Sequence, residues 1–361
     1  MNKKEAKNEM DELRAKTSGS EDGGAENPLN EVFADAPVSV PPKMPVVRQL
    51  ALLSTLLVFI FGIGAWPFFA EQLGTWRSSQ PATPAVSAEA VAPLNQVSSN
   101  PFSNISISAK SAIVIDLKTG EVLYEKAADQ KLPLASITKL MTALVAYEVV
   151  EEGMVVPITE EAVVQSGDSG LKEGERFTLS RLVDLILLTS SNDGAFALAT
   201  AAGRTIDKDA PAEAFVQSMN IRAKELGLTS LSFRNPTGLD LTESEAGAYG
   251  TARDVAKLLQ YIVENEPAIL EETTKAEATY GDINGGLHKA SNTNPVVDAV
   301  PGLIGSKTGY TTLSGGNLAI AWNAGADRGV VAVVLASSHS GRFTDILRLV
   351  DATKQKLIGA E

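Results

Sequence analysis

Two polar side chains, Ser136 and Lys139, stand at the start of an apolar stretch with the sequence ASITKLMTALVAYEV. Residues three apart share one face of a helix, and a serine in the first helical turn lies beside free backbone N–H groups. Serine becomes a nucleophile only when a base takes its proton, and lysine can be that base if burial and nearby cations lower its pKa. The pair therefore indicates nucleophilic catalysis; the alternative is a helix-capping serine followed by a surface lysine.

A second polar group, Ser190-Ser191-Asn192, interrupts two apolar helical stretches in the segment LILLTSSNDGAFALA. One interpretation is the end of one helix followed by the cap of the next. The functional interpretation places the Ser190 hydroxyl and the Asn192 amide beside Lys139. Ser190 would then pass a proton to a leaving amine, while Asn192 would bind the substrate backbone and hold the lysine.

The third pattern is Lys307-Thr308-Gly309, in the strand-like segment LIGSKTGYTTLSGGNLAIAW. On a strand, Gly309 permits close backbone approach. Lys307 would supply a fixed positive charge, and Thr308 a hydroxyl suited to a carboxylate. The backbone N–H of Tyr310, together with that of Ser136, would form an oxyanion hole.

Apolar periodicity predicts the elements that position these residues. A hairpin is predicted over 111–116 and 122–124; its turn holds a second Lys-Thr-Gly at 118–120, so this tripeptide alone has little specificity. Helices are predicted over 136–150, 178–188, 193–202, 212–226, 251–264 and 342–358, and late strands over 306–310, 317–322 and 329–336. The order predicts an α/β (α+β) fold whose sheet is assembled from both ends of the chain, with a helical insertion between them.

Composition excludes several classes of protein. The chain has 361 residues, with 31 Lys or Arg, 44 Asp or Glu, no cysteine and two histidines. The formal charge of −13 argues against a nucleic-acid binder, because phosphate contacts need a Lys/Arg surface. Without cysteine there is no disulfide, thiol nucleophile or thiolate-ligated metal. His288 and His339 lie outside the three patterns, so we expect surface or structural roles for them and neither a metal nor an organic cofactor.

The N-terminal part predicts a membrane anchor. The expected regions are a disordered cytoplasmic tail (1–45), a transmembrane helix (46–71), a Pro/Ser/Ala-rich linker (72–104) and a globular domain (105–361). Leu50–Ala70 is uncharged and long enough to span a bilayer. Lys43 and Arg48 before it favour a cytoplasmic N-terminus. We expect a single-pass protein of the cell membrane with its globular domain on the extracytoplasmic side; a signal peptide cleaved near VSAEA is the alternative.

Ser-x-x-Lys, Ser-x-Asn and Lys-Thr-Gly occur in this order on a predicted helix, loop and strand, which is the motif set of penicillin-recognising serine enzymes. Within that superfamily the chain resembles the low-molecular-mass D-alanyl-D-alanine carboxypeptidases, through segments such as SAIVIDLKTGEVLYEK, FRNPTGLD, YGTARDVAKLL and NTNPVV between residues 105 and 358. The resemblance implies a beta-lactamase/DD-peptidase fold, with an antiparallel sheet from N- and C-terminal strands and a helical subdomain. It implies Ser136 (nucleophile), Lys139 (base) and Ser190 as catalytic residues, and Asn192, Lys307, Thr308, Gly309, Tyr310 and Arg342 as substrate-binding residues.

The resemblance also implies a reaction: removal of the terminal D-alanine from peptidoglycan stem peptides ending in D-Ala-D-Ala, through an acyl-enzyme on Ser136. β-Lactams would acylate the same serine as covalent inhibitors. Three alternatives use the same fold: a DD-endopeptidase that cuts cross-links, a β-lactamase, and a non-catalytic penicillin-binding wall sensor. The sequence shows no clear glutamate loop of the kind a β-lactamase needs for deacylation.

Overall fold

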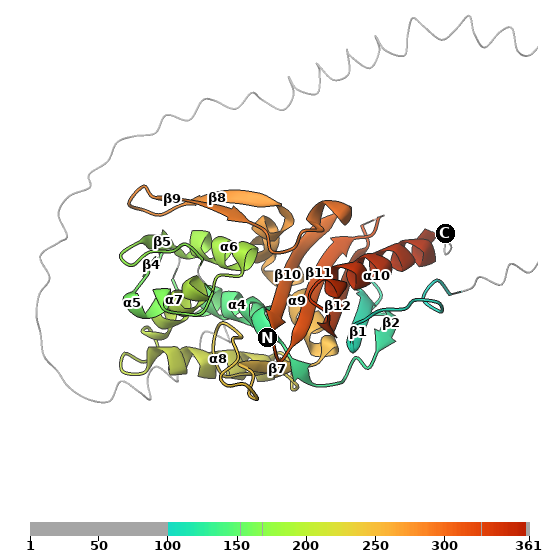
Figure 1. Ribbon diagram of the computed structural model, residues 1–361, viewed down its shortest axis with the longest axis horizontal. Coiled ribbons are helices and arrows are strands. Elements are labelled where there is room, and N and C mark those ends of the chain that lie inside the picture. Colours follow the sequence, from blue (N-terminus) through green and yellow to red (C-terminus); the bar gives the residue numbers. More distant parts are fainter. Residues whose placement is uncertain (1–99, 152, 168, 326, 359–361) are drawn as a thin grey trace, which may run out of the picture. The chain divides into compact units, whose positions relative to one another are not determined.

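The computed structural model describes residues 100–151, 153–167, 169–325 and 327–358 (Figure 1). The predicted tail, the predicted membrane span and nearly all of the predicted linker lie outside these residues. Within the described ranges, no helix combines the length and the apolar character needed to cross a bilayer. The four predicted regions of the chain therefore stay predictions.

A five-stranded antiparallel sheet combines strands from both ends of the described chain, as predicted. Its order is β10 (Leu303–Thr311), β11 (Gly315–Asn323), β12 (Gly329–Ser337), β1 (Ser111–Asp116) and β2 (Val122–Lys126). The early and late segments meet where β1 pairs with β12. In the part of the chain that the structure describes, β10 is at the edge of the sheet, so one side of this strand has no strand partner and faces the helical half of the molecule (Figure 1).

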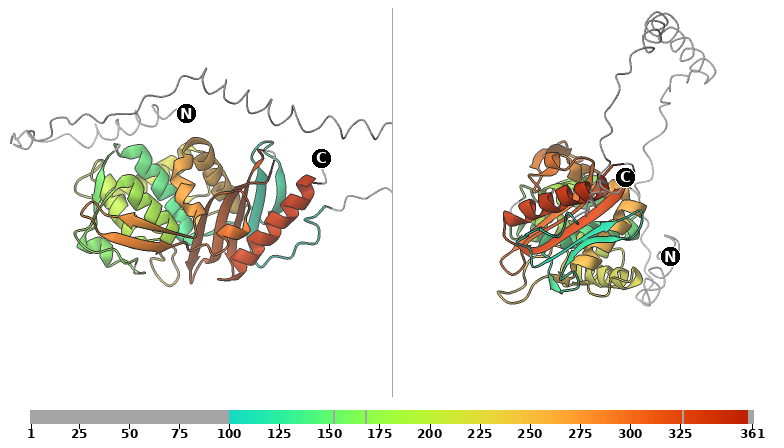
Figure 2. Two further views of the ribbon diagram at one scale, coloured as in Figure 1. Left: turned by 90° about the horizontal axis from the view of Figure 1, so that it is seen from above. Right: turned by 90° about the vertical axis from the view of Figure 1, so that its right-hand side faces the viewer.

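Each face of the sheet is covered by one long helix. The β12 side chains alternate: Val331 and Val333 belong to the apolar core that includes α9 (Ala252–Asn265), and Val330 belongs to the core that includes α10 (Gly341–Ile358). Period-two alternation sends successive strand side chains to opposite faces. Figure 2 shows α10, in red, lying along one face of the sheet.

The helical half holds the first two motifs. It contains α4 (Lys139–Val149), α5 (Glu160–Val163), α6 (Leu179–Thr189), α7 (Asn192–Gly203) and α8 (Pro211–Glu225), at the left of Figure 1. A 3-10 turn, η1 (Ala135–Thr138), leads into α4. The predicted helices are confirmed to within three residues at their ends, where assignments commonly vary.

Several shorter elements were not predicted. They are β3 (Leu132–Pro133), β4 (Val155–Pro157), β5 (Arg176–Thr178), β6 (Ser232–Phe233), β7 (Ala248–Gly250), η2 (Pro267–Thr274), the hairpin β8 (Glu277–Gly281) and β9 (Leu287–Ser291), and η3 (Val297–Ala299). Strands of two or three residues are too short for an apolar period to appear in the sequence. In the β8–β9 hairpin most side chains are exposed or half-buried, so no apolar alternation marks it.

Candidate active site

Ser136 lies in η1, in a segment that the central sheet holds in place. The Nδ2 atom of Asn317 on β11 donates to the carbonyl oxygens of Pro133 at 3.1 Å and Leu134 at 2.9 Å. The next residue, Ala135, has a left-handed backbone conformation with φ of 48°. Non-glycine residues hold such a conformation only where the surroundings impose it. The position of Ser136 therefore depends on a buried asparagine from the other end of the chain.

Lys139 is fully buried, and its amine has three polar neighbours. Nζ lies 2.9 Å from Ser136 Oγ, 2.7 Å from Asn192 Oδ1 and 2.7 Å from the carbonyl oxygen of Thr237. The last two atoms can only accept hydrogen bonds. A neutral amine has two N–H groups and one lone pair, so these two acceptors take both N–H groups and leave the lone pair for the Ser136 hydroxyl. The predicted spacing and the predicted Lys139–Asn192 contact are confirmed.

The surroundings of Lys139 favour the neutral amine. Burial is the largest cause that lowers the pKa of Lys139 well below its ordinary value, and the nearby cation of Lys307 lowers it further. Asp193 opposes the shift but does not cancel it. Desolvation disfavours a charged amine, and a like charge adds to that cost. The lysine is therefore better suited than an exposed lysine to accept a proton from Ser136.

Ser190 is paired with the other lysine. Lys307 Nζ donates to Ser190 Oγ and to the carbonyl oxygen of Thr308, both at 2.9 Å. The hydroxyl that we expected beside Lys139 thus accepts a hydrogen bond from Lys307. Ser190 itself has a left-handed conformation, with φ of 62°, where α6 ends. This turn aims its hydroxyl at β10.

Lys307, which we expected to supply a fixed positive charge, is buried close to a second cation, Arg342. Burial, followed by the nearby Arg342, lowers the pKa of Lys307 to about 7. The group is therefore divided between ammonium and amine near neutral pH. Because its Nζ contacts the Ser190 hydroxyl, Lys307 can supply a proton to that hydroxyl as well as attract a carboxylate.

Strand β10 passes very close to the nucleophile segment. A Cβ atom placed on Gly309 would lie 2.9 Å from the carbonyl oxygen of Leu134 and 3.2 Å from the backbone nitrogen of Ser136. Any larger residue would push the two segments apart. The contact brings the start of η1 to the strand that carries Tyr310, and the oxyanion hole from the N–H groups of Ser136 and Tyr310 stays a prediction.

Arg342, at the start of α10, approaches the same strand. Its Nη1 donates to the carbonyl oxygen of Gly309 at 2.7 Å, and its guanidinium lies 5.9 Å from the ring centroid of Tyr310. The residue is 5% exposed, and within the described residues its Nε has no hydrogen-bond partner. His339 is exposed, as expected, but its ring packs edge-on against Tyr310 at 4.7 Å. His288 lies on β9, with its Nε2 3.1 Å from Glu175 Oε1.

Sequence reasoning missed two contributors. Thr293 Oγ1 lies 2.6 Å from Thr308 Oγ1, which fixes the third-motif hydroxyl. The carbonyl of Thr237 holds Lys139, and its loop is shaped by Asn235, whose Oδ1 accepts from the N–H of Gly238 at 2.7 Å. The segments NTNPVV and FRNPTGLD that contain these residues were signals for them.

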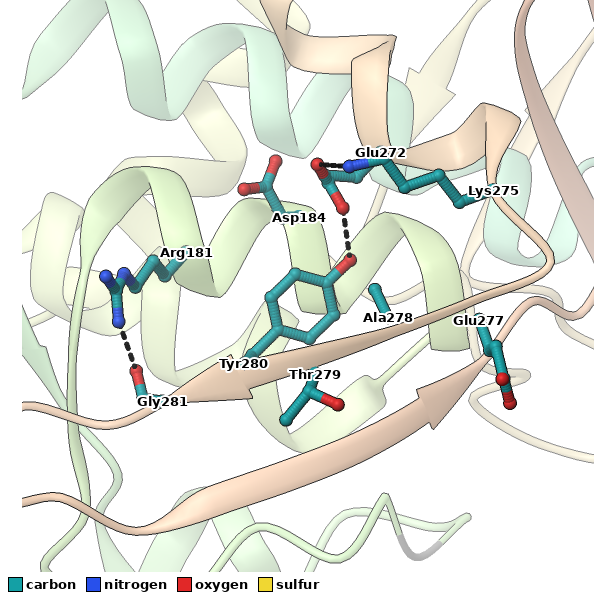
Figure 3. Close-up of a pocket in the computed structure, with 9 residues that line it drawn as sticks. All are labelled: Arg181, Asp184, Glu272, Lys275, Glu277, Ala278, Thr279, Tyr280 and Gly281. Carbon is teal, nitrogen blue, oxygen red and sulfur yellow. Dashed lines mark hydrogen bonds and ion pairs between the residues drawn. The ribbon is translucent and has the colours of Figure 1, made fainter.

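Two of the cavities formed by described residues lie in the helical half. One, of about 560 Å³, lies between α7, α8 and the loop 234–241 and is lined in part by Thr237. The other, of about 490 Å³, lies between α6, η2 and β8, and none of the predicted site residues lines it (Figure 3). Asp184 and Glu272 lie close together in this second cavity, and Tyr280 donates to Glu272 Oε2 at 3.3 Å. Within the described residues, no group of three His, Asp or Glu side chains is placed to hold a metal ion.

Comparison with known proteins identifies relatives of this chain. Residues 95–339 match the family model described as D-alanyl-D-alanine carboxypeptidase. The chain is 34% identical over 259 residues to the D-alanyl-D-alanine carboxypeptidase DacF of Bacillus subtilis, covering 69% of this chain and 63% of that protein. It thus spans less than two thirds of the length of that relative.

Solved structures share the fold. A D-alanyl-D-alanine carboxypeptidase from Mycobacterium tuberculosis is 27% identical, with a TM-score of 0.61, over 69% of this chain and 92% of that one. The Streptomyces K15 DD-transpeptidase is 26% identical, with a TM-score of 0.62, over 69% of this chain and 97% of that one. The expected mixed α/β fold of the DD-peptidases is therefore confirmed.

Proposed function

Because the chain belongs to the D-alanyl-D-alanine carboxypeptidase family, we propose that it hydrolyses peptidoglycan stem peptides ending in D-Ala-D-Ala and releases the terminal D-alanine. One observation carries this proposal: the buried Lys139 amine lies 2.9 Å from Ser136 Oγ, with both of its N–H groups taken by acceptors. A surface lysine that follows a capping serine would have neither the burial nor these partners.

In the proposed acylation step, the substrate carboxylate binds near Lys307, Thr308 and Arg342. Lys139 takes the proton of Ser136 as Oγ attacks the carbonyl carbon of the penultimate D-alanine. The backbone N–H groups of Ser136 and Tyr310 stabilise the oxyanion. The C–N bond then breaks, and the departing amine receives a proton from Ser190.

In the proposed reaction, two lysines carry the protons, and each returns to its starting protonation state. Ser190 regains its proton from the Lys307 ammonium, so acylation leaves Lys139 protonated and Lys307 neutral. Water then occupies the place of the departed amine and attacks the ester, giving its proton through Ser190 to Lys307. Lys139 returns a proton to Ser136 Oγ as the acyl group leaves. Both lysines end in their starting states, as the 2.9 Å contact between Lys307 and Ser190 allows.

The test combines a covalent probe with a defined substrate. We expect mass spectrometry to find a penicillin adduct on the wild-type protein and none on Ser136→Ala. A pentapeptide ending in D-Ala-D-Ala should release D-alanine, whereas a DD-endopeptidase would instead split a cross-linked dimer. Rapid turnover of penicillin would indicate a β-lactamase, and an unlabelled wild-type protein would eliminate the serine-enzyme proposal.

We also propose that residues 46–71 anchor the protein in the cell membrane and place the catalytic domain outside the cytoplasm. The uncharged run Leu50–Ala70 and the preceding Lys43 and Arg48 support this proposal. Peptidoglycan, the proposed substrate, lies on that side of the membrane. The full chain should stay in the membrane fraction after washing with sodium carbonate, and release of a shortened domain would indicate cleavage instead.

A further inference from the structure

Asp193 is a buried acidic residue next to the catalytic groups, and the proposed mechanism gives it no role. It follows Asn192 in the first turn of α7, and it is 1% exposed. The Oδ1 atom of Asn192 lies 2.7 Å from Lys139 Nζ. Aspartate is almost never fully buried unless another group compensates its charge. The position of this residue, next to one that contacts the base, indicates that the two charges act on each other.

The Asp193 carboxylate is held in place by a neighbouring serine. Its Oδ2 accepts from the Ser169 hydroxyl at 2.8 Å and from the Ser169 backbone N–H at 3.3 Å. The Ser191 hydroxyl donates to Ser169 Oγ at 2.8 Å and accepts from the N–H of Gly194 at 2.9 Å. Hydrogen bonds to a carboxylate and a place in the first turn of a helix both favour the ionised form. These contacts therefore keep a negative charge in one position at the start of α7.

The proposed acylation step creates a positive charge inside the protein. When Oγ of Ser136 attacks the substrate, its O–H bond breaks and the proton forms a third N–H bond on Lys139. This lysine is fully buried, and its contacts with Asn192 Oδ1 and with the carbonyl oxygen of Thr237 are contacts with neutral groups. A buried charge is costly unless an opposite charge compensates it. The ammonium therefore needs a nearby anion.

Among the described residues, two charged side chains act on the Lys139 amine in opposite directions. Burial is the largest cause that lowers its pKa, the cation of Lys307 on β10 lowers the pKa further, and the Asp193 carboxylate raises it. The other contacts of Nζ include the uncharged Ser136 hydroxyl from η1 and the Thr237 carbonyl from the loop that follows β6. A base whose pKa lies far below the working pH is a weak base, so the carboxylate limits a shift that would otherwise go too far.

We propose that Asp193 is a positioning residue whose buried charge stabilises the Lys139 ammonium that forms when the base takes the Ser136 proton. This inference rests on the proposed function and adds a residue that lies just after the second motif. Asp193 acts through Lys139, so its role requires no contact with the substrate. A charge that is favourable only after proton transfer raises the rate of the chemical step and not the affinity for substrate.

The test is Asp193→Asn, which removes the charge and keeps the shape, with an Oδ1 that can still accept from Ser169. The rate of penicillin adduct formation is followed by mass spectrometry as a function of pH. The base must be neutral, so acylation falls as the pH decreases through the pKa of Lys139. Removing the carboxylate lowers this pKa, so the fall should move to lower pH. The fall at high pH should not move, because burial and Arg342 set the pKa of Lys307.

The maximal rate of acylation should also decrease. Removing a hydrogen-bond donor in direct contact with a developing charge costs about 10²- to 10³-fold in kcat. Asp193 acts without such a contact, so we expect a smaller loss in Asp193→Asn, about tenfold. Thermal unfolding reports whether the variant folds, and Asp193→Ser, a smaller neutral variant, should give the same shift if the asparagine is not accommodated.

The matched control is Asp254→Asn. Asp254 is also buried in the first turn of a helix, α9, and its carboxylate accepts from the backbone N–H of a serine, Ser230, at 2.9 Å. It is not among the charges that shift the pKa of Lys139. The control variant should lose some thermal stability and should acylate with the wild-type rate and pH profile.

The outcomes separate this inference from the proposed function. A folded Asp193→Asn protein with the wild-type profile and rate would overturn the role of Asp193 and leave the carboxypeptidase proposal intact. A lower rate without movement of the fall at low pH would also overturn it, because a displaced loop predicts that result. An equal shift in Asp254→Asn would do the same. A wild-type protein that forms no penicillin adduct would remove the proposed function and this inference together.

Discussion

Replacing Gly238 by alanine tests whether the Thr237 carbonyl is required to hold Lys139. Gly238 has φ of +81°, and a Cβ atom on it would lie 2.0 Å from the carbonyl oxygen of Ala135. Ordinary contacts of a Cβ atom begin at 3.4 Å, so the loop and the nucleophile segment must separate by more than an ångström. We expect this movement to withdraw the Thr237 oxygen from its 2.7 Å contact with Lys139.

A displacement of about 1 Å in a catalytic constellation can cost about 10²-fold in rate. We therefore expect the second-order rate constant for acylation by penicillin to fall about 10²-fold in Gly238→Ala. The rate is measured by the formation of the penicillin adduct over time in a mass spectrometer. Thermal unfolding of the same preparation reports whether the fold is retained.

The matched control is Gly227→Ala. Gly227 also has a left-handed conformation, with φ of +69°, but a Cβ atom there meets nothing within 4 Å. Both variants carry the strain of a left-handed alanine, about 1 kcal/mol, and only Gly238→Ala adds the clash. Gly227→Ala should lose some thermal stability and acylate at the wild-type rate. A folded Gly238→Ala that acylates at the wild-type rate would refute the role of the Thr237 carbonyl.

Three further outcomes are expected. Burial and Arg342 lower the pKa of Lys307 to about 7, and its ammonium is the proposed proton donor, so kcat/KM for peptides should fall above pH 7. Arg342→Gln removes the neighbouring cation, so it should lower the activity and move this fall to higher pH. A pH profile of kcat/KM for both proteins measures the shift. Burial, followed by the charge of the nearby Glu272 (Figure 3), raises the pKa of Asp184 to about 7. The folded protein therefore keeps a proton that the unfolded chain releases near pH 4, and the free energy of unfolding decreases from pH 4 to 7. Asp184→Asn should raise the melting temperature at pH 8, and this gain should shrink toward pH 4. Asn317→Asp, which cannot donate to the carbonyl of Leu134, should lower both the melting temperature and the acylation rate, whereas an unchanged rate would mean that other contacts position the nucleophile.

Burial, followed by the neighbouring charge of Lys307, lowers the pKa of Lys139 and favours its neutral form. Lys139 and Lys307 are almost fully buried, and Arg342 is 5% exposed. Each charge raises the cost of the next one, because a low local dielectric strengthens repulsion. The substrate carboxylate would relieve this repulsion, so binding and catalytic protonation are linked in the proposed mechanism.

The sequence pattern over short stretches of the chain determined the helices, the strands and the chemistry of the three motifs. The apolar periods of α4, α6, α9 and α10 and the β-branched runs of β1 and β12 predict those elements, because each depends on side chains only a few residues apart. The Ser136–Lys139 contact belongs to this class, since both residues lie within one helical turn.

Tertiary structure alone decided which groups meet across the chain. The contact of Lys139 with Thr237 joins residues 98 positions apart, and that of Lys307 with Ser190 joins residues 117 positions apart. Thr237 contacts Lys139 through its backbone carbonyl, which every residue type possesses, so the residue type at position 237 does not predict this contact. The charge states of the lysines likewise follow from burial and from neighbouring cations, and both arise only when distant segments pack together.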